Sequence, residues 1–169
     1  MNKPDGEEKM KATAIILVIL CLAAFVGIGY LYMSAVIEVD SVELVAYEAS
    51  TQQALFDDLK EQTAESRLIG TMFAEAMPDR SDEQVFLQYT VNIRNNTFLK
   101  VEEAEIQITP LPGDVLQVGE TQPVDIPAHG NGGVSTTLLT SAGAKSIREL
   151  TVTYYVWGLP FKTRTTYGR

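Results

Sequence analysis

The sequence predicts a mainly β protein, in which an N-terminal transmembrane helix is followed by a β-sandwich with a helical insertion between its first two strands. Three observations predict this class. Residues 12–37 form an uncharged, mostly apolar run. Several later segments alternate apolar and polar residues and are separated by turn residues, which is typical of short sandwich strands. Residues 51–77 instead carry leucine, methionine and phenylalanine at roughly helical spacing.

The apolar run is long enough to cross a membrane. As a helix it would extend about 39 Å, whereas the hydrocarbon core of a bilayer is about 30 Å thick. Lys9 and Lys11 precede the run, and the next basic residue after it is Lys60. The positive-inside rule then predicts a single-pass protein of the cell membrane with a cytoplasmic N-terminus. The predicted parts are a cytoplasmic tail (1–11), a transmembrane helix (12–37) and an extracytoplasmic domain (38–169).

A cleaved signal peptide is the alternative interpretation of the run. Signal peptides usually have an apolar region of about 7 to 15 residues, and the best cleavage motif here, before Val36, has Met33 where a small side chain is preferred.

Bulky residues before Cys21 disfavour lipid attachment, so we expect a buried thiol. Ala23 and Gly27 have the small-xxx-small spacing of paired membrane helices, although small residues are common in such helices in any case. A homo-oligomer formed through this face is one interpretation.

The predicted extracytoplasmic domain is acidic and free of cysteine. Residues 38–169 contain ten Lys and Arg against nineteen Asp and Glu, so they carry the entire net charge of −9. This sign disfavours nucleic acid and anionic lipid as partners. Because no disulfide is available, the domain depends on a packed core, and about 130 residues are enough for one.

Alternation is clearest over residues 84–94, where apolar side chains recur at every second position. Asn95 and Asn96 tolerate positive φ and predict a tight turn. A hairpin with the following strand, which ends at Ile108 before Pro110, is therefore the simplest interpretation. About seven strands are expected in all. The other predicted strands are residues 39–47, 115–118, 134–140, 150–157 and 161–167.

Residues 51–77 are predicted to hold one or two helices. Ser50 or Thr51 can cap the first turn, Gly70 can divide the segment, and Pro78 ends it. We expect this insertion to pack against the sheet. A helix lying on the membrane surface is the alternative, but acidic residues outnumber basic ones here, which disfavours anionic head groups. Residues 78–83 form the polar connector that follows. This connector lacks the regular alternation and the glycine of a calcium loop, so no calcium site is expected there.

No catalytic residue, cofactor or metal site is predicted. His129 is the only histidine, and no cysteine of the domain accompanies it, so neither a metal site nor a catalytic base is expected there. Ser135 and the two threonines after it lie in a strand pattern, and no general base that could activate them is apparent, so no nucleophile is expected there. Acid–base chemistry needs converging carboxylates, and alternation turns Glu103 and Glu105 toward solvent. The carboxylates that an enzyme could use are Glu102, Glu103, Glu105 and Asp114.

Two sets of residues are candidates for modification or recognition. Asn95 begins an Asn-Asn-Thr sequon on the predicted outer side, so it is a candidate glycosylation site, and a turn without sugar is the alternative. In the last strand pair, Tyr155 and Trp157 alternate onto one face, opposite Tyr154. Either they form an aromatic platform for a glycan, a peptide or a protein, or they pack beneath the helical insertion.

The order of these segments resembles the late-embryogenesis-abundant type 2 domain, also described as the water-stress and hypersensitive-response domain. The resemblance covers residues 84–167 and implies an immunoglobulin-like or fibronectin-type III sandwich without catalytic residues. It rests on a strand ending in Asn-Asn (89–96), an alternating strand (101–108), a glycine turn with a short strand (113–119), an Ile-Pro-Ala element (124–128), a further strand (134–139) and a final hairpin (154–161).

Together these observations favour a non-catalytic binding or structural module that is tethered at the outer surface of the membrane. Its predicted partners are membrane lipid through the helix and a protein of the envelope, in a stress context if the resemblance holds. One alternative is a small accessory subunit of a larger membrane complex. Another is an enzyme accessory that uses the carboxylates named above. The sequence names no ligand.

Overall fold

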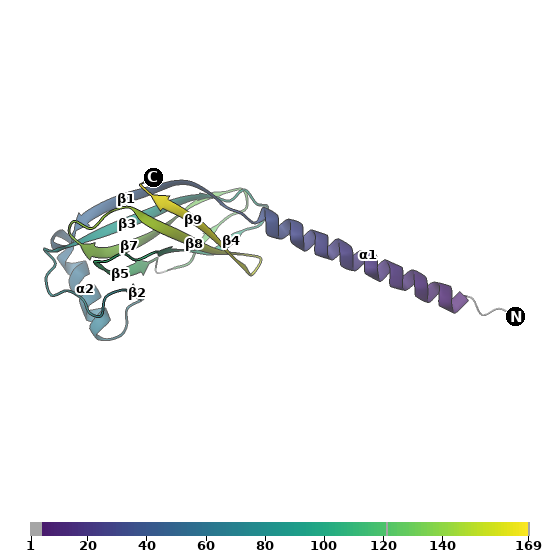
Figure 1. The fold of residues 1–169 in the computed structure, drawn as a ribbon, viewed down its shortest axis with the longest axis horizontal. Helices are drawn as coiled ribbons and strands as arrows, with labels where there is room; N and C mark the ends of the chain where they lie inside the picture. Colours follow the sequence, from purple (N-terminus) through teal and green to yellow (C-terminus); the bar gives the residue numbers. More distant parts are fainter. Residues whose placement is uncertain (1–4, 121, 169) are drawn as a thin grey trace. The chain divides into compact units, whose positions relative to one another are not determined.

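The computed structural model describes residues 5–120 and 122–168, and the chain forms two compact units that meet between Val36 and Ile37. The first unit is a single helix and the second is the β domain (Figure 1). The elements are α1 (Asp5–Ser34), β1 (Glu38–Glu48), the 3-10 helix η1 (Ala49–Gln52), α2 (Gln53–Ala64), β2 (Thr71–Met72), β3 (Gln84–Arg94), β4 (Val101–Ile108), β5 (Asp114–Gly119), β6 (Val124–Ile126), β7 (Asn131–Ser141), β8 (Arg148–Val156) and β9 (Leu159–Tyr167).

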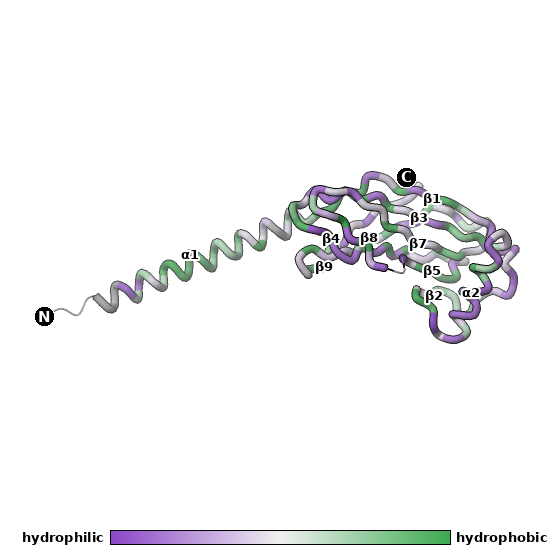
Figure 2. The backbone as a smooth tube through the Cα atoms, turned by 180° about the vertical axis from the view of Figure 1, so that it is seen from behind, coloured by the Kyte–Doolittle hydropathy of each residue, from purple (hydrophilic) through white to green (hydrophobic). Residues whose placement is uncertain are grey.

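The helix α1 is long and apolar enough between Lys9 and Ser34 to cross a membrane, a test that a signal sequence would also pass. Apolar residues predominate along it after a short polar start (Figure 2). It ends three residues earlier than predicted, because Ile37 is buried in the second unit. Cys21 is exposed on the helix surface, so protein atoms do not bury the thiol as expected.

The β domain consists of two antiparallel sheets. One sheet has the strand order β1-β3-β7-β5-β2 and the other β6-β4-β8-β9. Inward-facing side chains fill the space between them, among them Tyr89 and Val91 from the first sheet and Val152 and Tyr154 from the second. Gln117 joins the two sheets, because its side-chain amide donates to the Ile106 carbonyl at 2.6 Å and accepts from the Ile108 amide at 3.0 Å.

The predicted hairpin between residues 84–94 and the strand ending at Ile108 is wrong. β3 pairs with β1 and β7, whereas β4 belongs to the other sheet and pairs with β6 and β8. Asn95 and Asn96 do not adopt positive φ. The Asn95 side chain instead holds residues 95–99 as a connection that crosses from one sheet to the other. In the sequence, an asparagine with this role cannot be distinguished from an asparagine in a tight turn.

The segment between β1 and β3 is helical only in its first half. α2 ends at Ala64, and Ser66 then adopts a φ of 55°, which directs the chain out of the helix. Phe56 and Leu59 of α2 are buried against Phe86 on the face of the first sheet that points away from the sandwich core. Gly70 approaches β5 so closely that a Cβ atom would lie 2.3 Å from the Gln117 carbonyl oxygen. This approach lets β2 pair with β5 instead of extending a second helix.

Candidate binding groove

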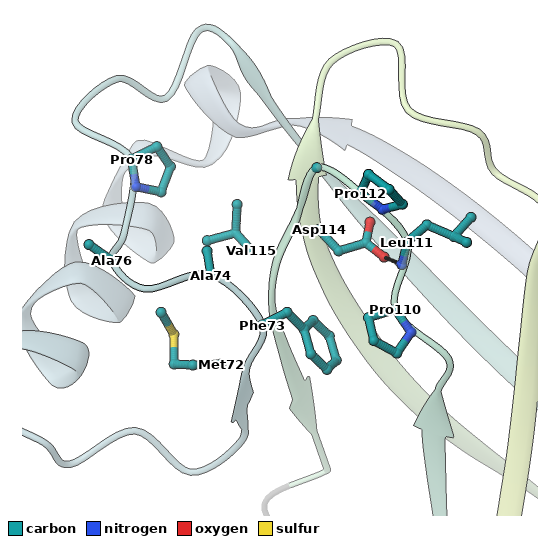
Figure 3. A pocket seen from close by; sticks show the side chains of 11 residues that line it. Met72, Phe73, Ala74, Ala76, Pro78, Pro110, Leu111, Pro112, Asp114 and Val115 are labelled. Carbon is teal, nitrogen blue, oxygen red and sulfur yellow. Dashed lines mark hydrogen bonds between the residues drawn. The ribbon is translucent and has the colours of Figure 1, made fainter.

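An open groove of about 820 Å³ lies where the segment after β2 passes the turn that precedes β5. One wall is formed by residues 72–78, and the other by the Pro110-Leu111-Pro112-Gly113 turn and the start of β5 (Figure 3). We call this feature the proline groove. The side chains that line it are Met72, Phe73, Ala74, Ala76, Pro78, Pro110, Leu111, Pro112, Asp114 and Val115.

Backbone hydrogen bonds fix both walls of the proline groove. The amides of Phe73 and Ala74 both donate to the Val115 carbonyl, at 2.9 and 3.0 Å, and so attach the first wall to β5. In the second wall Gly113 adopts a φ of 95°, a conformation that favours glycine. Its carbonyl accepts from the Ser141 amide at 3.1 Å. The groove is therefore largely preformed, as ligand sites usually are.

Behind the second wall lies a buried ion pair. Arg148 Nη2 donates to Asp114 Oδ1 at 2.7 Å, and both side chains are fully excluded from solvent. Asp114 Oδ2 accepts from the Leu111 amide at 2.7 Å, which ties the carboxylate to the proline turn. Arg148 Nη1 also donates to the carbonyls of Lys145 and Ile147. The pair thus determines the position of Leu111 at the rim of the groove.

Tyr89 packs beside this ion pair. Its hydroxyl donates to the Ser146 carbonyl at 2.7 Å, and its ring meets the Tyr167 ring edge to face with centroids 5.8 Å apart. Burial raises the pKa of Tyr89 to about 12, and the positive charge of Arg148 opposes this shift only in part. The phenol therefore stays neutral at physiological pH and acts as a hydrogen-bond donor.

The proline groove suits apolar recognition rather than acid–base catalysis. Asp114 is the only ionisable side chain in its lining, and both of its oxygens already accept structural hydrogen bonds. A general acid or base needs a free position within reach of substrate, which this carboxylate lacks. The neighbouring insertion is acidic, because residues 53–83 contain three Lys and Arg against eight Asp and Glu. The surroundings of the groove therefore favour a partner with positive charge.

Asn95, the candidate glycosylation site, is completely buried. Its Nδ2 donates to the carbonyls of Leu99, Ile126 and Pro127 at 2.8 to 3.3 Å. Its Oδ1 accepts from the amide and the hydroxyl of Thr97. A sugar on Nδ2 would displace these contacts, so the buried position of Asn95 favours the alternative without sugar.

Trp157 lies beyond the strand alternation that was used to place it on the same face as Tyr155. β8 ends at Val156, and Trp157 occupies the turn to β9 with a φ of 53°. Its side chain is 69% exposed, whereas Tyr155 is partly buried on the strand. The paired aromatic platform is therefore replaced by a single projecting tryptophan.

The four carboxylates considered for an enzyme do not all meet at one site. Glu102 and Glu103 border a small surface hollow together with Asp125, Glu105 lines a different hollow, and Asp114 lies buried beside Arg148. Glu103 adopts positive φ at a bulge in β4, which interrupts the alternation assumed for it. His129 also has positive φ and is exposed in the connection from β6 to β7. Among the described residues no group of three metal-binding side chains comes together.

Ala23 and Gly27 lie on one face of α1, as their spacing requires. Four larger side chains surround a shallow apolar hollow there. A Cβ atom on Gly27 would meet no atom within 4 Å, so this face is open along the helix. The surrounding residues are Ile19, Leu22, Val26 and Tyr30.

Comparisons with known proteins give no family for this chain. No family model matches it, and no curated protein matches it. Among solved structures it is similar to the GAE domain of yeast GGA1, with 10% identity over 57% of this chain and 84% of that chain and a TM-score of 0.37. It is also similar to a FixG-related protein from Vibrio parahaemolyticus, with 10% identity over 76% and 96% of the two chains and a TM-score of 0.34. Function is therefore inferred from the chain's own residues.

Sequence reasoning missed the proline groove. The Pro-Leu-Pro-Gly stretch is readable as a turn, but nothing in it indicates that residues 72–78 pass beside it. The available signal was the isolated Phe73, an aromatic residue in a segment whose helical periodicity is already interrupted by Gly70. Pairing of β2 with β5, which creates the groove, joins residues more than forty positions apart.

Proposed function

We propose that this chain is a single-pass membrane protein whose extracytoplasmic β-sandwich binds a protein partner without catalysing a reaction. The apolar helix α1 supports the anchoring, and Lys9 and Lys11 at its start support a cytoplasmic N-terminus. The proposed site is the proline groove. The observation that carries the proposal is its lining, which is apolar apart from one carboxylate whose two oxygens are already engaged.

The proposed occupant is an apolar segment of a partner protein that also carries basic residues. Leu111 and Phe73 offer exposed or partly exposed apolar surface in the groove. Acidic side chains of the insertion, such as Glu75 and Asp79, are exposed around it. Apolar anchors in a pocket supply most of the affinity of such interfaces, and complementary charge at the rim speeds association.

We further propose membership in the late-embryogenesis-abundant type 2 family, with a role in envelope or stress protection. The proposal is supported by strands β3 to β7, which occupy the segments that carry the resemblance. That family would supply a binding or protective module and no catalytic residues. A small subunit of a larger membrane complex would use the same groove for assembly.

The experiment compares two leucines of equal exposure. Leu111 lines the groove and is 40% exposed, whereas Leu55 lies outside the lining and is 42% exposed. Leu55 is the third residue of α2, where an aspartate is favourable, so Leu55→Asp is a suitable control. The tagged full-length chain is purified in mild detergent from its native membranes, and the co-purifying protein is then titrated against each variant.

We expect Leu111→Asp to weaken partner binding at least about tenfold, because a charge replaces an apolar contact in the groove. Leu55→Asp should bind like the wild type. Equal binding by all three proteins would contradict the assignment of the groove. A stoichiometric membrane partner that is retained by the wild type and lost by Leu111→Asp would identify the chain as an accessory subunit.

A further inference from the structure

The turn between β8 and β9 places an exposed tryptophan at its tip. Val156 pairs with Leu159, so the turn has only two central residues, Trp157 and Gly158. Both have positive φ, 53° and 73°, as the type I′ turn of a two-residue hairpin requires. Trp157 is the only tryptophan of the chain, and 69% of its surface is exposed.

Folding of the domain does not account for this residue. Position 157 of the turn normally favours asparagine, aspartate or glycine, and a bulky side chain at positive φ carries conformational strain. The exposed ring offsets little of that strain by packing. A strained and exposed aromatic residue is typical of a position retained for an interaction.

Further apolar side chains lie at the same end of the domain. Leu159 follows the turn and is 44% exposed, and Phe98, in the connection from β3 to β4, is 53% exposed. The strand pairing fixes their common location, because Val156 at the end of β8 pairs with Val101 at the start of β4. We call Phe98, Trp157 and Leu159 the aromatic tip.

This end of the domain is also where the chain enters it. The Ile37 amide donates to the Tyr154 hydroxyl at 3.4 Å, and Trp157 lies three residues after Tyr154, a distance of about 10 Å along a strand. Only residues 35–37 separate the end of α1 from β1, so the covalent chain from Ser34 to Glu38 spans at most about 14 Å. A bilayer crossed by α1 would therefore lie within reach of the aromatic tip.

We propose that the aromatic tip inserts into the interfacial layer of the bilayer that α1 spans. Tryptophan is enriched at the level of the lipid head groups, where its ring is buried and its N–H stays hydrated. Anionic lipid is not favoured as the target, because Lys100 beside the tip already has two carboxylates near it, Asp125 at 2.7 Å and Glu102 at 3.8 Å. The proposal rests on the membrane anchoring proposed above.

The single tryptophan provides a direct test in the full-length chain. The protein is reconstituted into phosphatidylcholine vesicles, with or without bromine on the acyl chains close to the head groups, and its tryptophan emission is recorded. Flotation of the vesicles shows separately whether the chain is anchored. The control is the double variant Trp157→Asn, Ile147→Trp, which moves the reporter to an exposed apolar position before the opposite end of β8.

We expect brominated lipid to reduce the wild-type emission at least about twofold, and to leave the emission of the double variant nearly unchanged. A chain that floats with the vesicles while its Trp157 emission is unaffected by bromine overturns the insertion but leaves the anchoring intact. Equal quenching of both proteins also overturns it, because the effect would not be specific to the tip. A chain that does not float overturns both proposals.

Discussion

The two ends of the β domain are each held by a buried polar side chain, but the chemistry differs. At the end that carries the aromatic tip, the neutral Asn95 has partners for both its amide nitrogen and its carbonyl oxygen. At the end that carries the proline groove, the charged Arg148 pairs with Asp114, and its buried Nε has no hydrogen-bond partner among the residues that the structure describes. One centre is neutral and satisfied, and the other is charged and incompletely satisfied.

This difference determines what each end tolerates. A neutral amide costs little to bury once its hydrogen bonds are made, whereas a buried charge depends on its counter-charge. The groove end should therefore be the more sensitive to loss of one partner. The tip end should respond only to loss of the amide itself.

The largest effect is expected from Arg148→Met, which leaves Asp114 buried without its counter-charge. We expect a loss of about 3 to 5 kcal/mol in the free energy of unfolding, measured by urea denaturation of the full chain in detergent and followed by circular dichroism. Arg94→Met is the control, because its ion pair with Asp40 is half exposed and should contribute less than about 1 kcal/mol. Equal losses in the two variants would refute the comparison.

Asn95→Ala should have the next largest effect. It removes the donor shared by three carbonyls and the acceptor of the Thr97 amide, so we expect a loss of about 2 to 3 kcal/mol in the same assay. The neighbouring Asn96, whose amide contacts Glu38 on the surface, provides the matched variant Asn96→Ala. A loss at Asn95 no larger than that at Asn96 would show that the amide does not hold the connection.

The smallest effect concerns alkaline pH and Tyr89. Because the pKa of Tyr89 is raised from 10.0 to about 12, the unfolded chain loses this proton first, and stability is lost between these two pH values. By about pH 11 the loss attributable to Tyr89 should be about 1 kcal/mol. Tyr89→Phe should abolish that part of the alkaline decline, and Tyr155→Phe should leave it in place. If the stability of Tyr89→Phe declined with rising pH as much as that of the wild type, Tyr89 would not be the cause of the decline.

The strands were largely predictable from the sequence because alternation is a local property. β3 was predicted with its observed bounds, 84–94, and β1 was predicted to within one residue at each end. Phe86 shows where alternation is insufficient: it points away from the sandwich core yet is buried, because α2 covers that face. Burial on a second face depends on an element elsewhere in the chain.

The candidate sites were less predictable for a similar reason. The sequon at Asn95 and the strand position of Trp157 were both inferred from neighbouring residues alone. Their actual roles depend on distant partners, such as the Pro127 carbonyl for Asn95 and the pairing of Val156 with Leu159 for Trp157. The proline groove depends on contacts of residues 72–74 with β5, and no local pattern encodes them.

The location of α2 between two directly paired strands has an evolutionary consequence. Glu48 and Val85 are opposite each other in the register of β1 and β3, so the whole excursion between them leaves and re-enters the sheet at adjacent positions. Such a closed excursion can change length and surface without altering the order of the strands outside it. Related scaffolds could thus acquire new recognition specificities by exchanging this one segment while the rest of the architecture is inherited unchanged.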